Sequence, residues 1–94
     1  MKIQIDPHTL ERAEERGTNE EEIKDVIESG FSIEAKHGRF GKAKVYPYNQ
    51  IRGGRFYEQK RVEVIYTIKE DTIITVTVYV FYGKWEVKDE NLLR

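Results

Sequence analysis

The spacing of apolar residues changes at Gly30, and this change constrains the fold more than any other feature of the sequence. Before it, Ile23, Val26 and Ile27 recur at the i, i+3, i+4 spacing of an amphipathic helix. After it, apolar and polar residues alternate as they do along β-strands. Four strands are predicted, at residues 31–35, 43–48, 57–68 and 72–82. The chain is therefore expected to form helices first and a sheet second.

Two helices are predicted ahead of these strands. The first runs from Asp6 to Gly17, because aspartate is a good N-cap, the proline after it has the φ of a first helical residue, and glycine often ends a helix. The second begins at Thr18, where Thr18 and Glu21 are predicted to form a capping box, and it ends at Gly30.

Turns are expected to join the strands in antiparallel order. Residues 36–41 contain two glycines and should reverse the chain, and residues 69–71 connect two long strands as a hairpin. Residues 49–55 are predicted to form a longer loop, and Pro47 should place the end of its strand at an edge or a bend. With a short edge strand at 2–5, the expected fold is α+β: two N-terminal helices packed on one face of a four- or five-stranded, curled antiparallel sheet.

The last predicted strand indicates which face of the sheet the helices cover. Its aliphatic side carries Ile74, Val76, Val78 and Val80. This side is expected to meet the helices, because it offers the larger apolar surface. The opposite side carries Thr77 and Tyr79 and is expected to stay partly open.

Length and composition exclude several classes of protein. Ninety-four residues make a single domain, 1–94. The absence of cysteine excludes disulfides, thiolate catalysis and cysteine-based zinc sites, and the presence of only two histidines argues against a histidine-rich metal site. We expect no metal and no cofactor. No apolar run is long enough to span a membrane and the N-terminus lacks a signal-peptide core, so no membrane partner and a cytoplasmic location are expected.

Charge is unevenly distributed along the chain. The net charge of −1 argues against a globally basic nucleic-acid binder. Residues 36–61, however, contain Lys and Arg throughout and Glu58 as their one acidic side chain, with His37 available to add charge below neutral pH. A local basic surface is therefore expected.

The first helix carries a polar stripe. His8, Arg12 and Arg16 recur every four residues and therefore lie on one side of the helix. Two like charges at this spacing mildly destabilise a helix, and a bound anion would relieve the repulsion. The helix dipole favours the neutral imidazole at the first turn, which suits a general base. A solvated charged face explains the same pattern, and this alternative stays open.

The order and spacing of short motifs resemble the family called DUF4258. The motifs are His8-x3-Arg12-x3-Arg16-Gly17, Tyr57-x2-Lys60, Thr75-Val76-Thr77-Val78-Tyr79 and Tyr82-Gly83-Lys84-Trp85-Glu86. That family is similar in element order to compact toxins of the RelE/ParE and BrnT type. Several relatives of that fold are metal-independent endoribonucleases, whereas others inhibit other targets, so the resemblance alone does not decide the activity.

The resemblance implies a metal-independent endoribonuclease or a toxin-like, RNA-interacting domain. His8 would act as general base or acid, with Lys60 and Tyr79 as the other catalytic residues. The implied substrate-binding residues are Arg12, Arg16, Tyr57 and Thr77. The arginines and the lysine would hold phosphate, the tyrosines would donate hydrogen bonds or stack on bases, and the threonine would orient the phosphate.

The sequence is compatible with three functions. They are an endoribonuclease, a catalytically silent module that binds RNA or a protein, and a structural or regulatory partner that does not use the stripe. The expected partners are RNA and a small partner or antitoxin protein, and the sequence does not indicate an oligomeric state. Trp85 is expected to pack over the end of the sheet. The tail, residues 86–94, would dock on the sheet, pair with a second copy or fray.

Overall fold

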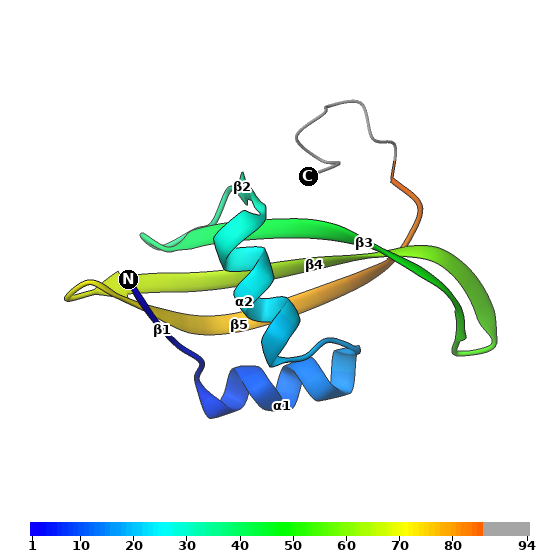
Figure 1. Ribbon diagram of the computed structural model, residues 1–94, viewed down its shortest axis with the longest axis horizontal. Helices are drawn as coiled ribbons and strands as arrows, with labels where there is room; N and C mark the ends of the chain where they lie inside the picture. Colours follow the sequence, from blue (N-terminus) through cyan, green and yellow to red (C-terminus); the bar gives the residue numbers. More distant parts are fainter. Residues whose placement is uncertain (86–94) are drawn as a thin grey trace.

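The computed structural model describes residues 1–85 and has a five-stranded sheet with two helices (Figure 1). The elements are β1 (Lys2–Gln4), α1 (Pro7–Arg16), α2 (Glu20–Ser29), β2 (Phe31–Ile33), β3 (Phe40–Arg52), β4 (Arg55–Lys69) and β5 (Thr72–Gly83). The strand order is β1-β5-β4-β3-β2. The α+β prediction is confirmed, but the sheet is mixed, because β1 pairs in parallel with β5. The three alternatives for the tail concern residues outside the described part of the chain.

Helix α1 begins and ends where the sequence predicts. The Asp6 side chain accepts a hydrogen bond from the backbone N–H of His8 at 2.8 Å. Gly17 ends the helix at a φ of 94°, and its N–H donates to the Ala13 carbonyl. Thr9 and Ala13 are buried. The helix runs beside β5 and in the same direction as that strand (Figure 1).

Helix α2 begins one residue later than predicted. The capping box of Thr18 and Glu21 is wrong, because Asn19 is the N-cap and accepts a hydrogen bond from the backbone N–H of Glu22 at 2.9 Å. Thr18 instead donates its hydroxyl to the Glu22 carboxylate at 2.7 Å. Asparagine is at least as good an N-cap as threonine, which explains the shift.

The predicted loop at residues 49–55 is wrong. Strands β3 and β4 continue through it as a twisted arm that extends beyond the helices (Figure 1). Only Gly53 and Gly54 form the turn, and both have the positive φ that a two-residue hairpin turn requires. The pairing of the two strands is irregular between Pro47 and Gln50, which agrees with the bend expected at the proline.

The core lies between the two helices and one face of the sheet, with α2 contributing more of it than α1. Its members with no exposed surface include Ile23, Val26, Val62, Val64 and Val78. A continuous apolar layer of this kind supplies most of the free energy of folding.

The predicted faces of β5 hold for only half of the strand. Tyr66 pairs with Thr75 but Ile65 pairs with Thr77, so Val76 is an extra residue and the alternation of faces shifts there. Ile73 and Thr75 are consequently buried on the helix side, where Ile74 and Val76 were expected. The Thr75 hydroxyl donates to Thr9 and accepts from the Asp6 N–H, so its burial leaves no unpaired polar group.

Candidate functional site

The sheet face opposite α2, which we call the open face, carries uncovered aromatic side chains. The cross-strand pairs Ile65–Thr77 and Glu63–Tyr79 lie on this face, and Phe81 continues it along β5. Tyr79 is 41% exposed and Phe81 is 47% exposed, and their ring centroids lie 6.4 Å apart. Two neighbouring rings are therefore available to a ligand that stacks on aromatic surfaces.

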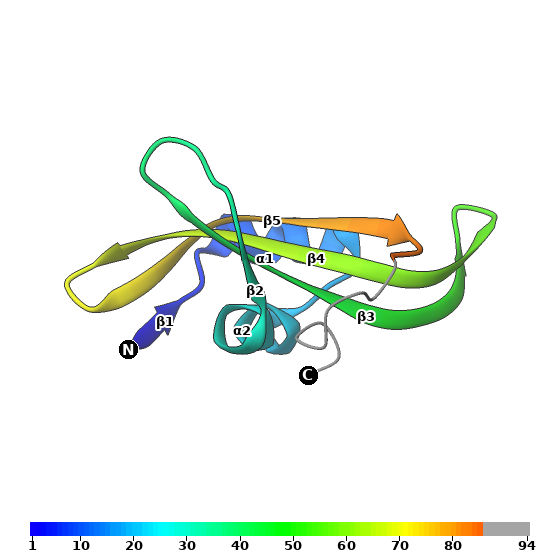
Figure 2. The ribbon, with the colours of Figure 1, turned by 90° about the horizontal axis from the view of Figure 1, so that it is seen from above.

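The connection between β2 and β3 rises over the open face on the side away from α2 (Figure 2). Together they enclose a concavity of about 300 Å³. Glu63, Ile65, Thr77 and Tyr79 line it from the sheet, and the connection adds three basic residues, Lys36, His37 and Arg39. A volume of this size is near the lower limit for small-ligand pockets, about 300 Å³.

Arg16 joins α1 to this face. Its Nη1 donates to the Val78 carbonyl at 2.6 Å, and its Cζ lies 5.2 Å from the centroid of the Tyr79 ring. The guanidinium thus donates a hydrogen bond to a backbone carbonyl on the outer side of β5 and also contacts the exposed tyrosine ring. Of the predicted site residues, the structure brings Arg16, Thr77 and Tyr79 to one edge of the sheet.

His8 and Arg12 lie farther along the same helix. Both are exposed, and each faces a carboxylate of its own helix: His8 Nδ1 is 3.7 Å from Glu11, and Arg12 Nη1 is 3.4 Å from Glu15. Eight residues of helix separate His8 from Arg16, which corresponds to about 12 Å along the axis. His8 therefore belongs to the outer surface of α1.

Lys60 lies on the helix-covered face of the sheet. Its Nζ donates to the Gly17 carbonyl at 2.9 Å and to Glu22 Oε1 at 2.8 Å, and the side chain is only 11% exposed. Thr77 and Tyr79 face the opposite side, so the structure separates Lys60 from them. The predicted convergence of His8, Lys60, Thr77 and Tyr79 on one surface is not found.

Two further side chains of the sheet bind the end of α1. Arg52 donates to the Glu15 carbonyl at 2.9 Å, and the Tyr82 hydroxyl donates to the Arg16 carbonyl at 2.6 Å. With Lys60, they satisfy three consecutive carbonyls that the helix leaves without intrahelical partners. This set of contacts gives Lys60 a structural role.

Lys60→Met is expected to lower the free energy of unfolding by about 2 kcal/mol, because it leaves the partly buried Glu22 carboxylate and a helix-end carbonyl without this donor. Lys24→Met is the matched control, since Lys24 pairs with Glu20 on the surface and is 46% exposed. Urea unfolding of both variants measures the difference. Equal losses in the two variants would contradict the structural role of Lys60.

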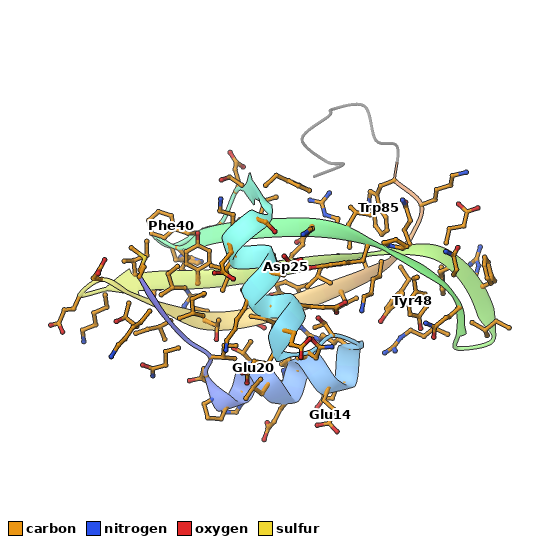
Figure 3. All side chains as sticks on the ribbon, viewed as in Figure 1. Glu14, Glu20, Asp25, Phe40, Tyr48 and Trp85 are labelled. Atoms are coloured by element: carbon orange, nitrogen blue, oxygen red, sulfur yellow. The ribbon has the colours of Figure 1, made fainter. Side chains whose placement is uncertain are left out.

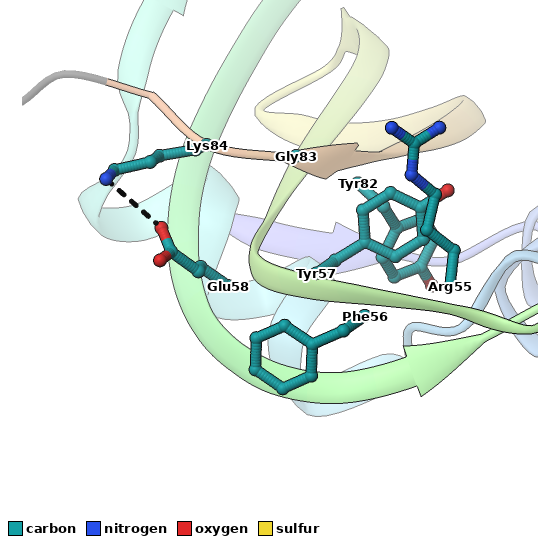
Figure 4. Close-up of a pocket in the computed structure, with 7 residues that line it drawn as sticks. All are labelled: Arg55, Phe56, Tyr57, Glu58, Tyr82, Gly83 and Lys84. Carbon is teal, nitrogen blue, oxygen red and sulfur yellow. Dashed lines mark ion pairs between the residues drawn. The ribbon is translucent and has the colours of Figure 1, made fainter.

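Tyr57 lies at the base of the β3–β4 arm. Its ring centroid is 5.6 Å from that of Tyr82, and both rings line a second concavity of about 570 Å³ (Figure 4). Lys84 and Glu58 close one side of it as an ion pair at 3.4 Å. Next to it, the Trp85 backbone N–H donates to Gln59 Oε1. Tyr57 therefore stands apart from Thr77 and Tyr79.

Asp25, which the sequence did not single out, lies on the side of α2 that faces the sheet (Figure 3). Its carboxylate accepts hydrogen bonds from Lys44 Nζ at 2.7 Å and Tyr46 Oη at 2.5 Å. The hydrogen bond from Lys44 is the main cause that lowers the pKa of Asp25 to about 2. Burial, followed by the bond to Asp25, raises the pKa of Tyr46. No sequence signal links these residues, because they meet only after α2 packs on β3.

The low pKa of Asp25 predicts a pH dependence of stability. Because the folded pKa is about 2 and the ordinary value is 3.8, the stabilising contribution is complete above pH 3.8 and is lost as the pH falls toward 2. In Asp25→Asn, the free energy of unfolding should depend less steeply on pH between about 2 and 3.8 than it does in the wild type. Urea unfolding at several pH values measures it, and parallel pH profiles would contradict the prediction.

Among known protein families, a family model described as "Domain of unknown function (DUF4258)" matches residues 5–80 of the chain. No curated protein and no solved structure matches the chain. In residues 1–85, neither helix is long and apolar enough to cross a membrane. The same residues contain no group of three or more histidine or carboxylate side chains that could hold a metal ion.

Proposed function

The chain belongs to the DUF4258 family, and we propose that it binds single-stranded RNA on the open face of its sheet. The observation that carries the proposal is the concavity in which exposed Tyr79 lies beside the basic connection of residues 34–39. Aromatic rings stack on unpaired bases, and nearby cations hold the phosphates between them. Tyr79 and Phe81 would provide the stacking surface.

Charge supports RNA over a protein partner as the occupant of this face. The net charge of the chain is −1, yet the connection brings Lys36, His37 and Arg39 to one concavity, and the Arg16 guanidinium of α1 lies near the ring of Tyr79, which lines it. Cations gathered around exposed rings suit a ligand with alternating bases and phosphates. An antitoxin-like protein partner is the alternative, and it would cover the same rings without a strong dependence on salt.

Salt dependence of binding tests the proposal. Fluorescence anisotropy with a single-stranded RNA of about 10 nucleotides measures the binding constant at several salt concentrations. The slope of the logarithm of this constant against the logarithm of the salt concentration should fall in magnitude by about 0.7 for each phosphate contact that a substitution removes. Arg39→Ala is expected to weaken binding and reduce the slope by this amount. Lys24→Ala, on the exposed side of α2, should change neither quantity. Equal slopes for Arg39→Ala and wild type would overturn the proposal.

RNA cleavage is a second candidate, because a histidine lies in the same concavity as two hydroxyl groups. His37 lines it with Thr77 and Tyr79. In metal-independent cleavage a base takes the proton of the 2′-hydroxyl, whose oxygen attacks phosphorus, and an acid returns a proton to the departing 5′-oxygen. The products are a 2′,3′-cyclic phosphate and a 5′-hydroxyl. Lys36 and Arg39 would stabilise the charge that develops on the phosphorus oxygens.

Substitution of the two histidines distinguishes cleavage in the concavity from cleavage by the polar stripe of α1, which the family resemblance implies. If cleavage uses the concavity, His37→Ala should abolish it and His8→Ala should leave it intact. If cleavage uses the polar stripe of α1, the effects are reversed. Both residues are exposed, so neither change should shift the melting temperature by more than a few degrees. Analysis of the products from a labelled RNA reads out both variants, and unchanged cleavage in both would exclude a histidine mechanism.

A further inference from the structure

We propose that the concavity on the open face selects guanine, and that Glu63 is the residue that reads the base. This inference rests on the proposed binding of RNA and adds to it the identity of one nucleotide. It follows from an acidic side chain at the floor of a concavity whose other charged residues are mainly basic.

Arg61 holds the Glu63 side chain in place. Arg61 Nε donates to Glu63 Oε2 at 2.9 Å, and the Arg61 guanidinium itself lies 5.2 Å from the centroid of the Phe31 ring. The carboxylate therefore has a fixed position on β4, beside its cross-strand neighbour Tyr79. A fixed acceptor discriminates between ligands better than a mobile one.

The second oxygen of Glu63 is available to a ligand. Among residues 1–85, no side chain or backbone group donates to Oε1, whereas Oε2 is bound by Arg61. In this part of the chain no buried side-chain oxygen or nitrogen lacks a hydrogen-bond partner, so Oε1 is not a buried, unsatisfied atom. The Glu63 side chain is 20% exposed, and its residue lines the concavity. Oε1 is thus a hydrogen-bond acceptor for a ligand that binds in the concavity.

Guanine is the base whose edge matches a carboxylate. Its Watson–Crick edge presents two adjacent donors, the N1–H and the N2 amino group. Glu63 can accept both together, one on Oε1 and the other on the second lone pair of Oε2, since Arg61 uses only one lone pair of that oxygen. Adenine and cytosine place a ring-nitrogen acceptor next to their amino group, and uracil flanks its single N–H with two carbonyl oxygens. In each of these three bases an acceptor would face the negative charge of Glu63.

The remaining walls suit the rest of a nucleotide. Ile33 and Ile65 provide an apolar surface for a flat ring, and Tyr79 adds an exposed aromatic ring. Lys36 and Arg39 lie on the connection above them and would hold the phosphate. A ligand with donors at one end and an anion at the other therefore fits the distribution of charge.

Binding of matched oligonucleotides tests this inference. Three strands are compared: oligouridine, and the same strand with one central guanine or one central adenine. The wild type is expected to bind the guanine strand about tenfold more tightly than the adenine strand. Glu63→Gln replaces an acceptor oxygen by a donor and should remove this preference while oligouridine binding is retained. Glu28→Gln, which changes an exposed carboxylate of α2 on the other side of the sheet, should keep it.

A mononucleotide titration separates failure of this inference from failure of the proposed function. Guanosine 5′-monophosphate is expected to shift the nuclear magnetic resonance signals of Thr77 and Tyr79 in the wild type, and adenosine 5′-monophosphate to shift them less. Equal binding of guanine and adenine strands would overturn guanine selection and leave RNA binding in place. If no oligonucleotide binds, the proposed function is overturned, and the mononucleotides alone then decide whether the concavity selects guanine.

Discussion

Gly30→Ala is expected to lower the free energy of unfolding by about 3 kcal/mol, a large share of the roughly 5 to 15 kcal/mol typical of a domain. An added Cβ would lie 2.6 Å from the Ala43 carbonyl oxygen and would also meet the Val26 carbonyl oxygen. Both are backbone atoms, so no rotation of a side chain relieves the overlap. Helix α2 would have to move away from β3 and disturb the core beneath it.

Gly53→Ala is the matched control for this prediction. Gly53 has a φ of 59° in the turn of the β3–β4 arm, and nothing lies within 4 Å of its added Cβ. The substitution therefore costs only the left-handed conformation of an alanine, about 1 kcal/mol. Urea unfolding compares the two variants. If the Gly30 variant lost no more stability than the Gly53 variant, the tight packing of α2 on β3 would be contradicted.

Tyr79→Ala combined with Phe81→Ala is expected to weaken RNA binding by about a hundredfold. Stacking of one base on an aromatic side chain contributes about 1 to 3 kcal/mol, and the double variant removes both rings of the proposed surface. The rings are 41% and 47% exposed, so we expect the fold to survive the change, and a melting curve verifies this. Fluorescence anisotropy with single-stranded RNA measures the loss of affinity.

Phe56→Ala provides the aromatic control for the double variant. Phe56 is 57% exposed, more than either ring of the open face, but it lies on the β3–β4 arm. Its removal should leave RNA affinity unchanged. A large loss in this variant, with none in the double variant, would place the binding surface on the arm beside the second concavity.

The sequence predicts the elements of this fold better than their exact pairing. Asp6 and Gly17 mark α1 because capping depends on local backbone conformation. The alternation of apolar and polar residues after Gly30 predicts the strands, because this alternation is also a property of the local sequence. The extra residue at Val76 is different, since it changes which side of β5 is buried and becomes visible only through the partners of Tyr66 and Ile65.

The candidate site depends even more on contacts between distant residues. A lysine at position 60 has the chemistry of a phosphate ligand, but its bonds to Gly17 and Glu22 join residues about forty positions apart in the chain. His37 lay in a stretch recognised as basic, yet only the fold brings it to Thr77 and Tyr79. Periodicity and motif spacing describe one element at a time. They therefore predict residue chemistry but not which side chains meet.

A resonance titration of the isoleucine methyl groups with single-stranded RNA tests the central claim, that the open face binds RNA. Ile33 and Ile65 line the concavity, whereas Ile23 and Ile73 are buried in the core on the other side of the sheet. Binding of RNA to the open face should cause shifts at Ile33 and Ile65 that saturate with RNA, and little change at Ile23 and Ile73. Unchanged signals from Ile33 and Ile65, under conditions in which the RNA is bound, would contradict it.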